Sequence, residues 1–467
     1  MLTSFPEEWQ IVTGSEFVVD PKSDIVDGPF GSNLKASEYT YSGIPIARIQ
    51  NVKRFNFVDK NIRFVTTEKA EELHRHTFVR GDILITKLGD PLGLACEVPE
   101  SFDYGIIVAD LVRLRPNLKV CAKPYLIYLL NSDVVIKQIE THVKGTTRPR
   151  INLGVIRNLS LPLASLAEQK VIADKLDTLL TQVETTKARL ERIPEILKNF
   201  RQSVLADAVS GKLLETKAEW KTEVLSDCFD CIDGDRGPNY PKKNDYQSEG
   251  YCLFLSTKNV RQFGFDFKET VFISKEKDSI LRKGKLERGD LVITTRGTIG
   301  YVASYDNSVQ YEVARINSGM LILRKKDPSY VNDYFKILIA SPYFQKLIEK
   351  NRTGSAQPQL PAKILKEFEL PVPPSEEQAE IVFRVDQLFN FADSIEQKAN
   401  AALERVNNLS QSILAKAFRG ELTTDWRAAN PELISGENSA EGLLAKIKTE
   451  RAKLNQTKKS RGKSIEN

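Results

Sequence analysis

The stretch Arg201-Gln-Ser-Val-Leu-Ala-Asp-Ala-Val-Ser-Gly-Lys-Leu213 returns 209 positions later as Ser410-Gln-Ser-Ile-Leu-Ala-Lys-Ala-Phe-Arg-Gly-Glu-Leu422. The same offset carries Glu168-Gln169 onto Glu377-Gln378. Solenoid modules repeat every few tens of residues, so a period this long excludes a solenoid. It predicts instead that one domain-plus-helix unit occurs twice, with an approximate two-fold relation between the copies. A duplex DNA, read at two places, is the leading candidate for a partner of such a chain.

Shorter stretches within the two domains also recur. They are Asn51–Phe57 with Asn259–Phe265, Arg80–Thr86 with Arg288–Thr294, and Gly145–Arg150 with Gly354–Gln359. Strand-length runs of branched apolar residues lie between glycine-rich turns at 44–49, 82–86 and 111–115, and a helix is expected over 124–140. We therefore expect one α+β domain of mixed α/β character to be used twice, with differing surfaces.

Each domain is followed by a long helix with apolar residues at alternating spacings of four and three. In the first helix they are Ile172, Leu176, Leu179, Val183, Thr186, Leu190, Ile193, Leu197, Phe200 and Val204. In the second they are Ile381, Val385, Leu388, Ala392, Ile395, Ala399, Ala402, Val406, Leu409 and Ile413. Sustained heptads predict that the helices pack together as an antiparallel coiled coil. An amphipathic helix lying on its own domain is the alternative.

One proline interrupts the first heptad series. Pro194 has Leu403 as its counterpart in the second helix. Because an interior proline removes a backbone hydrogen bond, we expect a bend or break near Glu191–Pro194, with Pro194 as the first residue of a restarted helix. A helix over 168–210 would span roughly 60 Å at about 1.5 Å per residue. Antiparallel helices would then separate two DNA-reading domains by at least one duplex turn, about 34 Å.

The predicted architecture has five parts. They are a first domain at 1–163, a helix at 164–214, a second domain at 215–372, a second helix at 373–425 and a basic tail at 426–467. We expect the tail to be partly helical, frayed beyond Asn455 and mainly solvated.

Composition is that of a water-soluble globular chain. Of 467 residues, 41% are hydrophobic and 28% charged, and no run of eighteen apolar residues is present, so no membrane span is expected. No secretory signal is recognisable, and five irregularly spaced cysteines favour reduced thiols in a cytoplasmic protein. A net charge of +5 permits nucleic-acid binding without requiring it, so any DNA contact must come from local cationic patches.

Catalytic signatures are missing from the sequence. It has no phosphate-binding loop, no dinucleotide fingerprint and no Asn/Asp-Pro-Pro-aromatic motif of amino-methyltransferases. The pair Cys228 and Cys231 lacks the second ligand pair that a zinc site needs, and three histidines form no acid–base cluster. We therefore expect no catalytic residue and no bound metal.

Side chains suited to DNA recur on the loops of both domains. Arginine and lysine hold phosphates or guanine, and asparagine and glutamine read adenine. The DNA-binding candidates are Asn33, Lys35, Lys53, Arg54, Lys87, Arg148, Arg150, Lys258, Arg261, Arg296, Gln357 and Gln359. Each of them alone could equally be a solvated surface residue, but several recur at equivalent positions.

Together these features resemble the specificity subunit of type I restriction–modification systems. The resemblance lies in the segments 162–169 and 371–378, the heptad helices, and the Gln-Ser-Val/Ile-Leu-Ala endings at 202–213 and 411–422, and it covers residues 1–426. It implies two target recognition domains, each reading half of a split and asymmetric DNA site. It also implies helices that space these domains and dock two methyltransferase subunits, joined by motor-nuclease subunits for cleavage.

By this resemblance the chain itself binds no cofactor, and S-adenosylmethionine is expected on the partner methyltransferase subunits. The helix residues expected to serve docking or helix pairing are Glu168, Gln169, Leu176, Leu179, Leu190, Leu197, Gln202, Glu377, Gln378, Val385, Leu388, Val406, Leu409 and Gln411. Two alternatives stay open: a non-enzymatic coiled-coil scaffold that joins two protein-binding domains, and a fused restriction–methylation enzyme.

Overall fold

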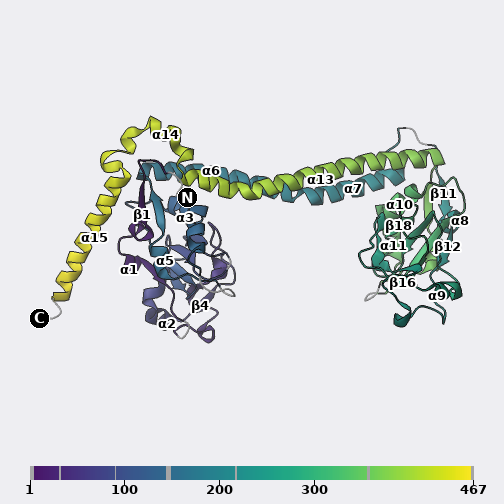
Figure 1. The fold of residues 1–467 in the computed structure, drawn as a ribbon, viewed down its shortest axis with the longest axis horizontal. Helices are drawn as coiled ribbons and strands as arrows, with labels where there is room; N and C mark the ends of the chain where they lie inside the picture. The colour runs from purple at the N-terminus through teal and green to yellow at the C-terminus, as the bar shows by residue number, and fades with distance from the viewer. Residues whose placement is uncertain are drawn as a thin grey trace. The chain divides into compact units, whose positions relative to one another are not determined.

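The computed structural model describes residues 5–30, 33–89, 91–143, 149–215, 218–354 and 358–463, without the side chains of residue 455 and residues 457–463. The chain forms two compact units. The first comprises residues 1–189 and 402–467, and the second comprises residues 190–401. Each unit thus takes in part of both long helical segments (Figure 1).

The first unit contains two four-stranded sheets and a two-stranded ribbon. In one sheet the strands lie in the order β2 (Ile25–Asp27), β9 (Leu111–Leu114), β6 (Ile83–Thr86) and β7 (Ala95–Glu97). In the other the order is β4 (Arg63–Val65), β3 (Ile44–Ala47), β8 (Tyr104–Ile107) and β5 (Thr77–Val79), with β3 and β8 parallel. The ribbon pairs β1 (Gln10–Thr13) with β10 (Ser160–Leu163).

Strand β6 lies in the middle of three layers. Ile83 and Ile85 pack on one side with Tyr125 and the helices, whereas Leu84 packs on the other side with Ala47 of the second sheet. Alternate side chains of a strand point to opposite faces, so a strand covered on both faces has apolar residues at nearly every position. All four residues of β6 are accordingly buried.

The second unit repeats this plan. Its main sheet has the order β12 (Phe229–Asp233), β20 (Met320–Lys325), β17 (Asp290–Thr294) and β18 (Val302–Tyr305). A second sheet has the order β16 (Phe272–Ile273), β13 (Cys252–Leu255) and β19 (Ala314–Ile316), and β13 and β19 are parallel as β3 and β8 are. The ribbon is β11 (Lys221–Val224) with β21 (Glu369–Val372), and a small hairpin joins β14 (Val260–Arg261) to β15 (Gly264–Phe265). The expectation of one α+β fold used twice is confirmed.

The helix expected over 124–140 is wrong as a single helix. The structure has α3 (Lys123–Leu130) and α4 (Asp133–Glu140), which are separated by Asn131 and Ser132. The Asn131 amide is committed to Ala95, accepting from its N–H at 3.1 Å and donating to its carbonyl at 2.8 Å, so this residue anchors the chain to β7. In the second unit α10 (Asn332–Ala340) and α11 (Pro342–Asn351) divide in the same way at Ser341.

Shorter helices complete the domains. They are α1 (Pro21–Asp24), α2 (Thr67–Glu72) and α5 (Leu153–Arg157) in the first unit, and α8 (Leu225–Cys228), α9 (Lys275–Ile280) and α12 (Ala362–Lys366) in the second.

The first long helical segment is broken where the proline predicted a break. Helix α6 (Leu166–Glu191) ends, Arg192 lies between the helices, and α7 (Ile193–Ser210) begins. Pro194 is the second residue of the restarted helix rather than the first, a position where proline is still tolerated because the N–H it lacks has no partner in the first turn. The second long helix, α13 (Ser375–Phe418), runs without interruption past Leu403.

The long helices pair within each unit. In the first unit Ile172 and Leu176 of α6 share a core with Leu414 and Phe418 of α13, and the Lys175 ammonium donates to the Leu422 carbonyl at 2.7 Å. The start of α6 therefore meets the end of α13.

In the second unit α7 packs against the beginning of α13. Val204 and Leu205 share a core with Ile381 and Val385. Arg201 reaches Asp393 at 2.6 Å and Glu396 at 2.9 Å, while Arg384 donates to the carbonyl of Leu213 at 2.7 Å. Later positions of α7 thus meet earlier positions of α13, which makes this pair antiparallel.

The basic segment at 426–467 was expected to be partly helical, and this is confirmed. The expectation that it is mainly solvated and frayed beyond Asn455 is wrong. The chain after α13 forms α14 (Thr424–Ala429) and α15 (Ala440–Lys463), whose helix continues beyond Asn455. Ala440, Leu443 and Ile447 are buried in the core of the first unit. The amphipathic spacing of these three residues in a charged stretch was the signal that could have predicted the packing.

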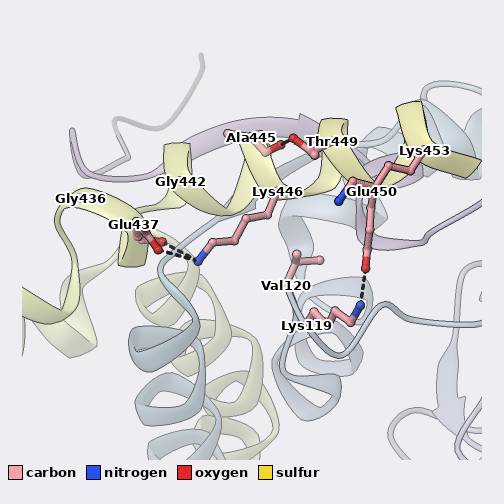
Figure 2. A pocket seen from close by; sticks show the side chains of 10 residues that line it. All are labelled: Lys119, Val120, Gly436, Glu437, Gly442, Ala445, Lys446, Thr449, Glu450 and Lys453. Atoms are coloured by element: carbon pink, nitrogen blue, oxygen red, sulfur yellow. Dashed lines mark hydrogen bonds and ion pairs between the residues drawn. The ribbon is translucent and has the colours of Figure 1, made fainter.

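Polar contacts also fasten α15 to the first unit. The Arg451 guanidinium donates to the carbonyls of Ser15, Val18 and Val19. Glu450 pairs with Lys119, and Figure 2 shows this contact beside that of Lys446 with Glu437. The hollow under this face of α15, of about 560 Å³, is lined by these paired side chains together with Val120, Ala445 and other residues.

Candidate nucleic-acid interface

In the first unit several candidate side chains come together at one end of the main sheet. Strands β2 and β6 both run antiparallel to β9, so both end at the same edge. The Lys87 ammonium, directly after β6, lies 2.6 Å from the carboxylate of Asp27, the last residue of β2. Leu88 then forms a β-bridge with Arg150. The edge thus presents Lys87 and the exposed Arg150 close together.

The second unit builds the same edge from different side chains. Arg296, two residues after β17, forms a β-bridge with Gln359. The Leu360 N–H donates to the Thr295 carbonyl at 2.9 Å, and the Arg296 N–H donates to the Gly319 carbonyl at 3.2 Å, which fixes both segments. Arg296 and Gln359 are exposed. Equivalent backbone bridges therefore carry Arg150 in one unit and an arginine–glutamine pair in the other.

Four further candidates lie on exposed loops. Asn33 and Lys35 follow β2, and Lys53 follows a short turn of helix at Ile49–Asn51. In the second unit the counterpart turn carries exposed Lys258. The side chain of the neighbouring Thr257 packs against Gly319, which in turn contacts Arg296. Lys258 thus follows a residue that is held at the edge containing Arg296.

Two further candidates, Arg54 and Arg261, bond to other side chains of the protein. Arg54 is half-buried against the helices, where the Gln411 amide accepts from it and donates to Asp133 at 2.8 Å. Burial lowers the pKa of the Arg54 guanidinium, and the charge of Asp133 partly opposes this. Arg261 pairs with Asp266 at 3.2 Å. Arg148 and Gln357 lie outside the described residues.

Asp27 is a site residue that the sequence analysis missed. A single aspartate at a strand end gives no pattern, and its pairing with Lys87 depends on how the two strands lie in the sheet. The Asp27 carbonyl also lies 2.6 Å from Nδ1 of His76, an atom that must donate to a carbonyl. These contacts hold Lys87 in place and partly neutralise it at the edge.

The glutamate–glutamine pairs expected at docking surfaces are engaged inside the units. Glu168 is fully buried and accepts from Trp9 at 2.8 Å, from Thr423 at 2.6 Å and from Arg427 at 2.7 Å. Gln169 is also fully buried, and its amide bonds the backbone of residues Val120, Ala122 and Ala164. These side chains therefore join the helix to its own domain and present no surface to a partner.

The second unit repeats this arrangement. Glu377 accepts from Trp220 and from the Ala218 N–H, both at 2.6 Å, and Gln378 accepts from the Val331 N–H at 2.9 Å. The donors to Glu377 come from one continuous stretch of chain. Those to Glu168 come from Trp9 and from Thr423 and Arg427, so a segment from the start of the chain and the segment after α13 meet at this carboxylate.

Most of the remaining helix candidates serve packing. Leu176, Leu197 and Val385 are buried, and Leu179, Leu190, Leu388 and Val406 are partly buried. Gln202 and Leu409 are exposed. Other large apolar side chains on the helices are also exposed: Ile196 by 58%, Phe383 by 56% and Phe391 by 60%. The sequence analysis missed these three because they lie off the heptad positions.

The cysteine pair at 228 and 231 is not poised for chemistry. Burial, followed by the hydrogen bond with Glu223, raises the pKa of the Cys228 thiol to about 12. Burial raises that of Cys231 to about 11. Within the described ranges no group of three or more His, Cys, Asp and Glu side chains is arranged to hold a metal ion. No helix in that part of the chain is long and apolar enough to cross a membrane.

Both units therefore contain the same α+β domain with cations at one edge of its main sheet, which defines the chain as a tandem-domain protein. A family model described as the type I restriction modification DNA specificity domain matches residues 36–195 and 217–405. The chain belongs to this family, and it is a specificity subunit rather than a catalytic one.

Relatives match over nearly the whole chain. The chain is 40% identical to the type I restriction enzyme EcoBI specificity subunit of Escherichia coli, covering 93% of this chain and 92% of the relative. It is 39% identical to the EcoKI specificity subunit of Escherichia coli K12, covering 98% and 99%. The crystal structure of the HsdS subunit from Thermoanaerobacter tengcongensis superposes with a TM-score of 0.61 at 21% identity, covering 89% and 98%, which supports the fold.

Proposed function

We propose that this chain binds double-stranded DNA and that each of its two α+β domains reads one half of an asymmetric, bipartite site. The observation that carries the proposal is the pair of equivalent β-bridges, Leu88–Arg150 and Arg296–Gln359. One backbone scaffold holds different base-reading side chains in the two domains. A palindromic site would need matching side chains, so the two half-sites differ.

The chemistry of each edge suits a different half-site. Arginine binds guanine through O6 and N7, and glutamine binds adenine through N6 and N7. Lys87, paired with Asp27 in the free protein, can exchange this partner for a DNA phosphate. At each edge, backbone hydrogen bonds fix the loops, and the polar ends of the side chains are exposed. This arrangement provides the positioning that base readout requires.

The long helices, in this proposal, space the two domains and dock two methyltransferase subunits, with motor-nuclease subunits joining for cleavage. The exposed apolar side chains Phe383, Phe391 and Ile196 support docking, because large aromatic residues at protein interfaces contribute much of the binding energy. S-adenosylmethionine binds to the methyltransferase subunits, and the assembly acts in the cytoplasm.

The test uses the chain assembled with its methyltransferase subunits. Adenine methylation mapping of DNA from cells that express the complex supplies the recognition site. Arg296→Ala and Lys87→Ala are then titrated against the site and against duplexes scrambled in either half. Arg296→Ala, which removes a base contact, should lose roughly 10–100-fold (about 1–3 kcal/mol) in one half-site only. Lys87→Ala, which removes a phosphate contact, should weaken binding to every duplex alike and make affinity less dependent on salt.

Arg80→Ala is the matched control, because Arg80 precedes β6 and therefore lies at the opposite end of this strand from Lys87. Its DNA affinity should be unchanged. Titration at two salt concentrations adds a second readout, since phosphate contacts make affinity fall steeply with salt. A wild-type complex without salt-dependent DNA affinity would indicate a protein-binding scaffold instead.

Docking is tested separately. Phe391→Asp places a charge on an exposed helix position and should weaken methyltransferase association, as measured by analytical ultracentrifugation. Asn390→Asp, which introduces the same charge at the exposed neighbouring position, is the control. Equal association of both variants would exclude the Phe391 side chain as part of the dock.

A further inference from the structure

Phe30 is a large apolar side chain exposed at the DNA-reading edge of the first unit. Its side chain is 75% exposed, although the two residues before it, Gly28 and Pro29, are buried. A phenylalanine left in water forgoes the favourable free energy of burying its ring. Single exposed apolar residues are common on protein surfaces, so the position and rigidity of the loop decide what Phe30 does.

The base of this loop is fixed. The Gly28 N–H donates to the Leu111 carbonyl at 3.2 Å. A Cβ at position 28 would lie 2.1 Å from the carbonyl carbon and oxygen of Val108, so only glycine allows this approach. The Asn33 N–H donates to the Phe30 carbonyl at 2.8 Å. The ring therefore projects from an anchored backbone.

The loop leaves the sheet beside the cations of the proposed interface. Phe30 follows β2 by three residues, and the last residue of β2, Asp27, pairs with Lys87. Lys87 in turn precedes the bridge of Leu88 with Arg150. When Lys87 and Arg150 contact DNA phosphates, the exposed ring of Phe30 beside them lies against the bases in the groove between the two sugar–phosphate backbones.

The second unit has the same loop with a different tip. There β12 ends at Asp233, and Gly234 makes an equivalent close approach, with its Cβ position 2.2 Å from the Asn317 carbonyl oxygen. The residue in the place of Phe30 is Arg236, which lies 3.3 Å from Asp233 and has a side chain that is 53% exposed. One anchored loop thus presents an apolar ring in one domain and a cation in the other.

We propose that Phe30 is a base-contacting, specificity-determining residue that packs its ring on the apolar surface of bases in the first half-site. This inference rests on the proposed function. Phenylalanine contributes to readout either by contact with a thymine methyl group or as a wedge between base steps. Both use the same apolar chemistry, and the arms of the experiment separate them.

The experiment titrates Phe30→Ala and Phe30→Leu, each in complex with the methyltransferase subunits, on the mapped recognition site and on a duplex scrambled in the half-site that Arg296→Ala does not affect. Phe30→Ala should lose roughly 10–100-fold on the intact site, the range of one good base contact, with an unchanged salt slope. On the scrambled duplex it should equal wild type. Phe30→Leu should keep part of the affinity.

Tyr41→Ala is the matched control, since Tyr41 is 93% exposed but precedes β3 and so lies at the end of that strand away from the loop. Uracil in place of thymine should reproduce the loss if the ring contacts a methyl group. A 2-aminopurine fluorescence increase that is lost in Phe30→Ala indicates a wedge.

Equal affinities of Phe30→Ala and wild type on the intact site would overturn the inference, and so would equal losses on both duplexes. Failure of the proposed function looks different, because the wild-type complex itself would then not prefer the mapped site. Thermal melting of the variants verifies folding, and the exposure of the ring predicts an unchanged midpoint.

Discussion

Arg115 holds the carboxylate of Asp82 through two hydrogen bonds of 2.8 Å, from Nε and from Nη2. The second unit contains the same pair, with Arg324 bonded twice to Asp290 at 2.9 Å. In both units the aspartate also accepts a backbone N–H three residues earlier, from Val79 or from Glu287, and so fixes the turn that enters the central strand. This pair is a structural signature of the duplication.

Removing the buried carboxylate should destabilise the first unit. Asp82 has a side chain only 2% exposed, so Asp82→Ala leaves the guanidinium and the turn N–H without their acceptor. Loss of one partner of a buried pair costs about 3–5 kcal/mol. Arg115 is 43% exposed and can recover water, so we expect the lower end, about 3 kcal/mol, in denaturant unfolding.

Asp103→Ala is the control for this measurement. Its side chain is 89% exposed and lies 3.9 Å from Arg80, a contact expected to contribute below about 1 kcal/mol. Similar destabilisation by both variants would show that the Asp82 pair has no special structural role.

The carboxylate of Glu168 should hold the segment at Trp9 and the segment after α13 on the first unit. Glu168→Ala would leave the Trp9 indole N–H and the Arg427 guanidinium, which is 11% exposed, without their acceptor. We expect a loss of about 3–5 kcal/mol and faster proteolysis on both sides of the link, at the N-terminus and after Thr423. Glu376→Ala, on an exposed helix position, should behave as wild type. Proteolysis at one end only would refute the shared anchor.

Packing of α15 predicts that its buried face matters for stability. Ile447 is 1% exposed in the core of the first unit, and Ile447→Ala should cost about 2–5 kcal/mol. Lys448→Ala on the exposed face should leave stability within about 0.5 kcal/mol of wild type. Calorimetry of the two variants measures the difference, and no difference would mean that the helix is solvated as the sequence first indicated.

Attachment of α15 should weaken in acid. The hydrogen bond from Lys119, together with that from Asn117, lowers the pKa of the Glu450 carboxyl below its ordinary value of 4.5, against the opposing effect of burial. A carboxyl with a depressed pKa adds stability that is complete above about 4.5 and is lost as the pH falls through the lower folded pKa. Hydrogen exchange along α15 should therefore accelerate below that pH.

The variant Glu450→Gln provides the comparison for this pH effect. It should exchange faster at neutral pH and lose most of the acid dependence, because the group that titrates is gone. An acid dependence as steep as that of wild type would assign the effect to another carboxyl.

The sequence predicts those features of the fold that depend on residues close together in the chain, and it fails for features that depend on contacts between distant residues. The repeat, the main strands and the break before Pro194 rest on local patterns, and the structure confirms them. Two expectations failed because tertiary contacts overrode local preference. Asn131 divides an otherwise helical stretch by bonding to Ala95, and the basic segment after Trp426 packs through Ala440, Leu443 and Ile447.

In the candidate interface, too, some features are visible in the sequence and others depend on the tertiary structure. That a cation follows the strand Ile83–Thr86 in one domain and Asp290–Thr294 in the other is visible in the sequence, because strand ends and loops are local features. Three other contacts depend on which strands and helices are neighbours, and these the sequence does not reveal. They are the contacts of Lys87 with Asp27, of Arg296 with Gln359, and of Arg54 with Gln411 beside Asp133.

The amino-acid sequence by itself determined that this protein is a duplicated α+β chain with paired helical segments, because apolar periodicity and recurrent motifs are properties of one dimension. Only the tertiary structure decided which polar side chains face outward. It also decided which of them are buried, as Glu168 and Gln169 are, where they bond a helix to its own domain. The physical reason is that a buried polar group must find a partner, and its partners lie far away along the chain.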